Sequence, residues 1–217
     1  ESRWAPPLCW VLYHSCTLFR DLKWVTTPDG RAWGSRFPAL CIRDMVAAER
    51  QLLALLGIDE LLGVIGGSMG GARALEWAAM YPEMAGSACV IATSARSSAW
   101  QIGIQTAQIC AVETDPDWQN GDYYDTGRCP DRGLGAARRI AHLTYRGERE
   151  LDARFGRAHQ GDGDPAVGGR YQIESYLDYH SGKLLARFDA NTYLIVTHSM
   201  MVFDVGPKRG GTEAALG

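Results

Sequence analysis

A serine lies between closely spaced glycines in the run Gly66-Gly67-Ser68-Met69-Gly70-Gly71. Gly66, Ser68 and Gly70 have the G-x-S-x-G spacing of a nucleophile elbow, a sharp strand-to-helix turn that exposes the serine hydroxyl. Such a turn strains the serine backbone, and the glycines let the strand and the helix approach without Cβ clashes. The amides and the dipole at the start of the helix favour an oxyanion. The pattern predicts a serine nucleophile for acyl transfer, and the alternative is a plain strand–turn–helix of small residues.

Other glycine motifs do not fit this stretch. A dinucleotide-binding loop needs glycines at positions n, n+2 and n+5, and the run has no such set. A phosphate-binding loop needs Gly-Lys-Ser or Gly-Lys-Thr, but Gly71 is followed by Ala72 and Arg73. The sequence therefore favours covalent chemistry at the serine over nucleotide binding at this turn.

Composition narrows the class of protein. The chain has 217 residues and a formal net charge of −3, so no basic field indicates nucleic acid or an anionic membrane as a partner. It has no apolar run of about 18 residues, and its first residues lack the layout of a signal peptide. The six cysteines form no CxxC pair and no zinc-type spacing, so we expect reduced thiols, no metal site and a cytoplasmic location. Cys89, inside an apolar run, is expected in the core.

The elements around Ser68 form a βαβ pattern. We expect a helix that begins at its N-cap Asp44 and ends near residue 56, and then a strand over residues 61–65. The helix after the serine should end before Pro82, because the residue before a proline is disfavoured in helices. Residues 87–92 are apolar and β-branched, which favours a parallel strand covered on both faces. The sequence thus predicts an α/β domain.

Helices dominate the sequence after residue 96. They are expected over residues 101–112, 134–145, 148–155, 174–187 in part, and 191–203. Residues 97–180 contain no convincing strand. The simplest interpretation is a helical lid inserted into an α/β core, above Ser68. We therefore divide the chain into a segment at 1–27, part of the core with the nucleophile elbow at 28–96, the lid at 97–190, and a return helix and loop at 191–217.

A serine nucleophile needs a base, and the base needs an orienting carboxylate. The histidines after the serine are His142, His159, His180 and His198. None follows a predicted strand, where the histidine of such a triad belongs, so packing or surface roles are the better interpretation. Asp189 is better explained as the N-cap of the returning helix than as the orienting acid.

Arg138, His142 and Tyr145 are spaced i, i+4 and i+7, so they share one helix face. An arginine fork binds a carboxylate through two parallel hydrogen bonds, and the tyrosine hydroxyl could add a third. This face would suit an amino-acid substrate. A solvated face, with Arg139 and Arg146 beside it, is the alternative.

These residues, together with longer runs, resemble homoserine O-acetyltransferase, a family of the α/β-hydrolase superfamily. The runs that carry the resemblance, with gaps within several of them, lie at 34–46, 66–82, 91–96, 117–124, 132–145, 174–177 and 187–194. Gly-Gly-Ser-Met-Gly-Gly at 66–71 with Leu-Glu-Trp at 75–77, and Phe-Asp-Ala-Asn-x-Tyr at 188–193, are its most specific parts. The match covers about residues 28–216, as a piece truncated at both ends.

The resemblance implies transfer of an acetyl group from acetyl-CoA, a co-substrate, to L-homoserine in methionine biosynthesis, through an acyl-serine and with no bound cofactor. Ser68 matches the nucleophile, and the backbone N–H of Met69 would be one oxyanion donor. Arg138 matches the arginine that holds the homoserine carboxylate, and Tyr145 the tyrosine that lines its pocket. The lid would exclude water from the intermediate. A homodimer is implied for the full-length family.

The chain also departs from the family pattern. Residues 1–26 do not match it, and the family's catalytic aspartate and histidine lie beyond the point matched by Gly217. We therefore expect a partial core with strands missing at both ends, and little turnover from this chain as written. The alternatives are an inactive fragment of the family, or a relative with another acyl group or acceptor: a homoserine O-succinyltransferase, a serine O-acetyltransferase or a hydrolase.

Overall fold

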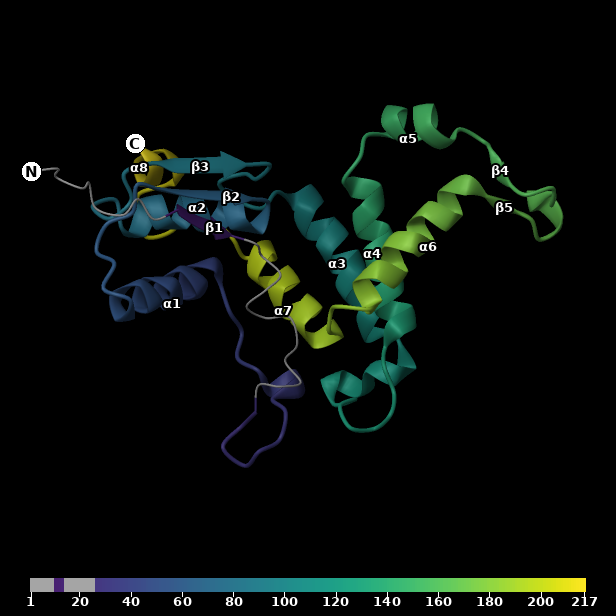
Figure 1. Cartoon of the computed structure of the whole chain (residues 1–217), viewed down its shortest axis with the longest axis horizontal. Coiled ribbons are helices and arrows are strands. Elements are labelled where there is room, and N and C mark those ends of the chain that lie inside the picture. Colours follow the sequence, from purple (N-terminus) through teal and green to yellow (C-terminus); the bar gives the residue numbers. More distant parts are fainter. Residues whose placement is uncertain (1–9, 14–25) are drawn as a thin grey trace, which may run out of the picture. The chain divides into compact units, whose positions relative to one another are not determined.

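The computed structural model describes residues 10–13 and 26–217, which form two compact units (Figure 1). The first unit contains residues 38–101 and 195–217 together with the start of the chain, and the second contains residues 102–194 with the segment that ends at Phe37. The division falls within α3 (Ala99–Glu113) and α7 (Ala190–Met201). Most of the segment at 1–27, including Cys9 and Cys16, lies outside the described residues.

The first unit contains a parallel sheet in the order β1 (Trp10–Tyr13), β2 (Gly63–Gly67), β3 (Ala88–Ile91). Helix α2 (Met69–Met80) follows the central strand directly and packs along β2 and β3, and α1 (Ile42–Leu55) packs on α2 (Figure 1). The short α8 (Thr212–Leu216) also contacts α2. Its hydrophobic core combines buried side chains of α1, β2 and α2 with two from the adjoining segments. They are Val46, Leu53, Val64, Ala74 and Trp77 from the three elements, and Leu61 and Met84 from the segments beside them. The strand–helix–strand pattern expected around Ser68 is therefore present.

Helix α1 begins earlier than the sequence analysis predicted. Its N-cap is Cys41, and Asp44 stands three residues later, where its carboxylate accepts a hydrogen bond of 2.8 Å from the Cys41 N–H. The prediction that Asp44 is the N-cap is wrong, because an acidic side chain at the third helical position can satisfy the cap amide equally well.

Strand β3 is parallel as expected, but it is not covered on both faces. In the part of the chain that the structure describes, all four residues of β3, including Cys89, are exposed. The expectation of a buried strand and a core cysteine is therefore wrong for this chain. The reason is that β3 is the edge of the described sheet, so its apolar side chains lack neighbours on that side.

A cluster of ion pairs around the buried Glu76 joins the segment before α8 to α2. The Glu76 side chain is 1% exposed, and it bonds the Arg43 Nε at 2.5 Å and the Arg209 Nη1 at 2.6 Å. Arg43 also donates to the carbonyl of Pro207. The cluster therefore joins α1, α2 and the segment before α8.

The second unit is mainly helical. Helices α4 (Asp131–Thr144) and α6 (Gln172–Leu185) lie side by side and make its largest contact (Figure 1). The remaining elements are η2 (Gly34–Arg36), η3 (Pro116–Gly121), α5 (Glu148–Phe155), β4 (His159–Gln160), η4 (Pro165–Val167) and β5 (Arg170–Tyr171). Strands β4 and β5 form a small antiparallel pair where no strand was predicted. Two residues per strand are too few to show the alternation that reveals strands in a sequence.

None of the helices among the described residues is long and apolar enough to cross a membrane.

Candidate active site

Ser68 lies at the turn between β2 and α2, and its backbone adopts φ 55° and ψ −121°. A positive φ is unfavourable for a residue with a Cβ, so the surrounding structure must hold it. The Ser68 N–H donates to the carbonyl of Ile91 at 2.9 Å, and its own carbonyl accepts from Ala72 at 3.1 Å. The residue is exposed. This is the strained, outward-facing serine that the glycine spacing predicts.

Two glycines make the turn sterically feasible. A Cβ on Gly66 would lie 2.1 Å from the carbonyl oxygen of Gly70, and a Cβ on Gly71 would lie 2.7 Å from the Thr93 Cγ2. At Gly67 the nearest atom would be 3.9 Å away, which is an ordinary contact. The close approach of β2 to the start of α2 therefore requires glycine at position 66, and the approach of α2 to the end of β3 requires it at position 71.

Met69 is the first residue of α2, so its amide is one of those that a helix start leaves without an intrahelical acceptor. The Met69 side chain is 7% exposed, and its sulfur lies 4.0 Å from the Ser199 hydroxyl of α7. The buried side chain anchors the residue, while its backbone stands beside Ser68. The position suits an oxyanion donor.

The described residues include no histidine hydrogen-bonded to the Ser68 hydroxyl. His142 and His180 pack together in the second unit, and His159 lies against Tyr171 in the β4–β5 pair. His198 is exposed on the last turn of α7. The packing and surface roles expected for these histidines agree with their positions.

Arg138 of α4 and Tyr145, the residue that caps the end of α4, meet as their spacing predicts. The Arg138 Nη1 donates to the Tyr145 hydroxyl at 3.3 Å, and the guanidinium carbon lies 5.5 Å from the centre of the tyrosine ring. Tyr145 is 62% exposed. The pair presents a guanidinium and a phenol together, which are donors that a carboxylate can use.

His142 lies between these two residues in the sequence and is 8% exposed. Its ring stacks on His180 of α6 at 4.0 Å and lies edge-on to Tyr145 at 5.2 Å. Burial lowers the pKa of His142 to about 4, and the charges of Arg138, His180 and Arg146 act in the same direction. His142 is therefore uncharged at neutral pH.

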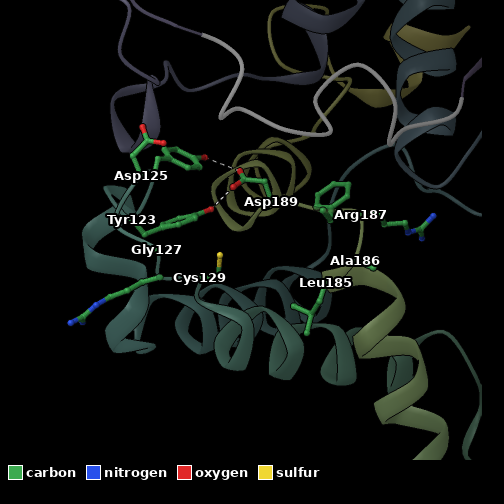
Figure 2. A pocket seen from close by; sticks show the side chains of 11 residues that line it. Tyr123, Asp125, Gly127, Cys129, Leu185, Ala186, Arg187 and Asp189 are labelled. Atoms are coloured by element: carbon green, nitrogen blue, oxygen red, sulfur yellow. Dashed lines mark hydrogen bonds between the residues drawn. The ribbon is translucent and has the colours of Figure 1, made fainter.

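A pocket of about 510 Å³ lies elsewhere in the second unit, beside the start of α7 (Figure 2). The hydroxyls of Tyr123 and Tyr124 both donate to Asp189, and Asp189 also accepts from the Thr192 N–H at 2.8 Å. Burial, and then the Asp189 charge, raise the pKa of both tyrosines. Asp189 is thus the N-cap that the sequence predicted, and its carboxylate accepts hydrogen bonds from two tyrosines and from the first turn of α7.

The described part of the chain has no cluster of three or more histidine, cysteine or acidic side chains that could hold a metal ion.

The site residues predicted from the sequence lie in both units. Ser68 and Met69 belong to the first, and Arg138 and Tyr145 to the second. The stacking of His142 on His180 was not predicted, because the two histidines are far apart in the sequence and share no motif. The sequence indicated only that His142 shares a helix face with Arg138 and Tyr145, and it gave no sign of the contact with His180.

Comparison with known proteins decides the family. The family profile described as alpha/beta hydrolase fold matches residues 20–204, which is most of the chain. The chain belongs to the α/β-hydrolase family. The predicted fold class, a partial α/β-hydrolase core with many helices, is confirmed.

The resemblance to homoserine O-acetyltransferases is also confirmed. The chain is 56% identical over 189 residues to the "Homoserine O-acetyltransferase" of Mycolicibacterium smegmatis, a match that covers 87% of this chain and 50% of that protein. The chain thus spans about half the length of the curated relatives it matches.

Two of the solved structures that are similar to this chain illustrate the likeness. The homoserine O-acetyltransferase from Bacillus anthracis has a TM-score of 0.78 at 22% identity, covering 90% of this chain and 52% of that one, and it supports the fold alone. Esterase E22 has a TM-score of 0.76 at 26% identity, covering 87% of this chain and 52% of that one.

Proposed function

We propose that this chain carries the nucleophile and the acceptor-binding residues of a homoserine O-acetyltransferase, which moves an acetyl group from acetyl-CoA to L-homoserine. The observation that carries the proposal is the exposed Ser68 at φ 55°, on a turn where Gly66 and Gly71 leave no room for a Cβ. High identity to proteins of that name supports the choice of substrates.

The chemistry proceeds in two halves. The Ser68 oxygen attacks the acetyl carbonyl carbon, its proton passes through a base to the sulfur, and CoA leaves as a thiol. The Met69 N–H stabilises the oxyanion of the tetrahedral intermediate. The homoserine hydroxyl then attacks the acetyl-serine, its proton returns to Ser68, and O-acetylhomoserine leaves. Arg138 and Tyr145 hold the homoserine carboxylate.

The experiment follows CoA release from acetyl-CoA with and without L-homoserine, together with the mass of the intact protein. We expect a covalent acetyl group on the wild-type chain and none on Ser68→Ala. Ser98→Ala removes another exposed hydroxyl of the first unit, one that accepts a hydrogen bond from the Gln101 N–H; it is the control and should still be acetylated. An acetylated Ser68→Ala chain would contradict the proposal.

We also propose that the 217-residue chain by itself turns over slowly. Among the described residues Ser68 has no histidine partner, and removing members of a catalytic triad lowers rates by orders of magnitude. We further predict a preference for acetyl-CoA, which activity with succinyl-CoA tests. We also predict that the full-length protein is a homodimer, which light scattering tests, and that it is cytoplasmic, which cell fractionation tests.

A second candidate function is hydrolysis of acetyl esters. The likeness to esterase E22 favours it, since an elbow serine can pass its acetyl group to water as well as to an alcohol. The two functions differ in their products: acetate indicates the hydrolase, and O-acetylhomoserine indicates the transferase.

A further inference from the structure

Three buried polar atoms in the described part of the second unit have no hydrogen-bond partner. They are the Gln105 Oε1, the Arg138 Nε and the His142 Nε2. A buried polar atom without a partner loses its hydrogen bonds to water and gains none in return, so such atoms are rare and call for an explanation. A ligand that hydrogen-bonds them is one explanation.

The three side chains lie in one region of the unit. Arg138 and His142 are one turn apart on α4, and both contact Tyr145. Gln105 is one turn before Gln108 on α3, and Gln108 accepts a hydrogen bond from the Tyr193 hydroxyl. Tyr193, which bonds Gln108, also interacts electrostatically with Arg138 and Tyr145.

Tyr193 supplies that connection. Burial and the neighbouring Tyr145 raise the pKa of the Tyr193 hydroxyl, while the charge of Arg138 lowers it. The Tyr193 hydroxyl therefore lies within electrostatic reach of the Arg138–Tyr145 pair and is bonded to the α3 face that carries Gln105.

The atoms fit an amino-acid zwitterion. The carboxylate accepts hydrogen bonds and needs donors, which Arg138 and Tyr145 supply. The ammonium group only donates and needs acceptors. The Gln105 Oε1 is an acceptor, and the Nε2 of an uncharged His142 is an acceptor when the ring carries its proton on Nδ1.

We propose that His142 and Gln105 accept hydrogen bonds from the α-ammonium group of the acceptor amino acid while Arg138 holds its carboxylate. The two residues then select an amino acid over the hydroxy acid of the same length. The Tyr145 ring lies edge-on to His142 and is largely exposed, so this side chain can rotate to admit the ligand and then donate its hydroxyl proton to the carboxylate. The inference rests on the proposed function, because it shares the carboxylate site.

The experiment compares two ligands by calorimetric titration of the 217-residue chain. L-homoserine and 4-hydroxybutanoate have the same carboxylate and terminal hydroxyl, but 4-hydroxybutanoate lacks the ammonium group. We expect homoserine to bind more tightly. His142→Phe, which keeps an aromatic ring, and Gln105→Met should each weaken homoserine binding about tenfold and leave 4-hydroxybutanoate within about twofold of the wild type.

Matched controls are Leu143→Ala on α4 and Gln172→Met on α6, both at exposed positions. Circular dichroism verifies that each variant is folded. The inference is overturned if homoserine binds no more tightly than 4-hydroxybutanoate, if neither ligand binds, or if both variants weaken the two ligands equally. Turnover is not measured, so a chain that discriminates between the ligands but forms no acetyl-serine contradicts the proposed function alone.

Discussion

Gly66, Gly67 and Gly71 surround the same serine but make unequal contributions to its geometry. At positions 66 and 71 a methyl group would overlap neighbouring atoms, whereas at position 67 it would find ordinary contact distances. The strained backbone of Ser68 is therefore maintained by two glycines, and the third is replaceable.

Gly66→Ala should destabilise the chain by about 2–3 kcal/mol, because the added Cβ would overlap the Gly70 carbonyl and separate β2 from α2. Gly67→Ala is the matched control. It should be neutral or slightly stabilising, since alanine narrows the conformations of the unfolded chain. Urea unfolding followed by circular dichroism measures both, and equal stabilities of the two variants would contradict the steric argument.

The buried His142 predicts a pH dependence of stability. Its pKa is about 4 in the folded chain and near 6.5 when unfolded, so the unfolded chain binds the proton more readily. The stability it confers is complete above about pH 6.5 and is lost as the pH falls towards 4. Between pH 7 and 5 the loss is about 2 kcal/mol at 1.36 kcal/mol per pKa unit.

His142→Phe should remove that part of the pH dependence, because phenylalanine keeps the packing but does not titrate. Urea unfolding at pH 7 and pH 5 measures it. His159→Phe, at an exposed position on β4, should keep the wild-type difference between the two pH values. A His142→Phe chain that loses as much stability as the wild type would show that other groups cause the dependence.

At the scale of elements, β3 is an edge strand whose apolar side chains are exposed. Val90 is 36% exposed and Ile91 49% exposed, and the outer edge of the strand has no neighbour among the described residues. Unpaired edges with apolar side chains invite pairing with other chains. The isolated chain should therefore self-associate through β3.

Val90→Lys should reduce this association, because a charge on an edge strand opposes pairing. Light scattering during incubation measures the effect. Leu55→Lys, at an 85% exposed position on α1, introduces the same charge away from the edge and should change the scattering less. Equal effects of the two lysines would assign the change to net charge instead of to the edge.

The helices could be predicted from the sequence better than the burial of side chains. Helices such as α4 and α5 were found because their apolar spacing and terminal residues are local signals. The exposure of Cys89 could not be predicted, since burial depends on neighbours that the local pattern does not contain. Of the candidate site, the turn at Ser68 and the Arg138–Tyr145 face were readable, because each depends on residues close in sequence.

At the scale of the whole molecule, the α/β-hydrolase profile matches most of the chain, but the chain spans about half the length of its homoserine O-acetyltransferase relatives. The contact between His142 and His180 joins helices α4 and α6 from separate parts of the second unit. Such long-range contacts leave no periodic signal in a single sequence, which is why the proposed ammonium site emerged only from the structure.

The hydrogen bond from the Ser68 amide to the Ile91 carbonyl offers a way to observe the first unit without any substrate. The amide is shielded only while the end of β2 stays aligned with the end of β3, so its exchange with deuterium reports the opening of that joint. The same residue is exposed, and it is the nucleophile of the proposed reaction. The side chain of Ser68 thus serves as a probe of reactivity, and the deuterium exchange of its backbone amide measures local unfolding.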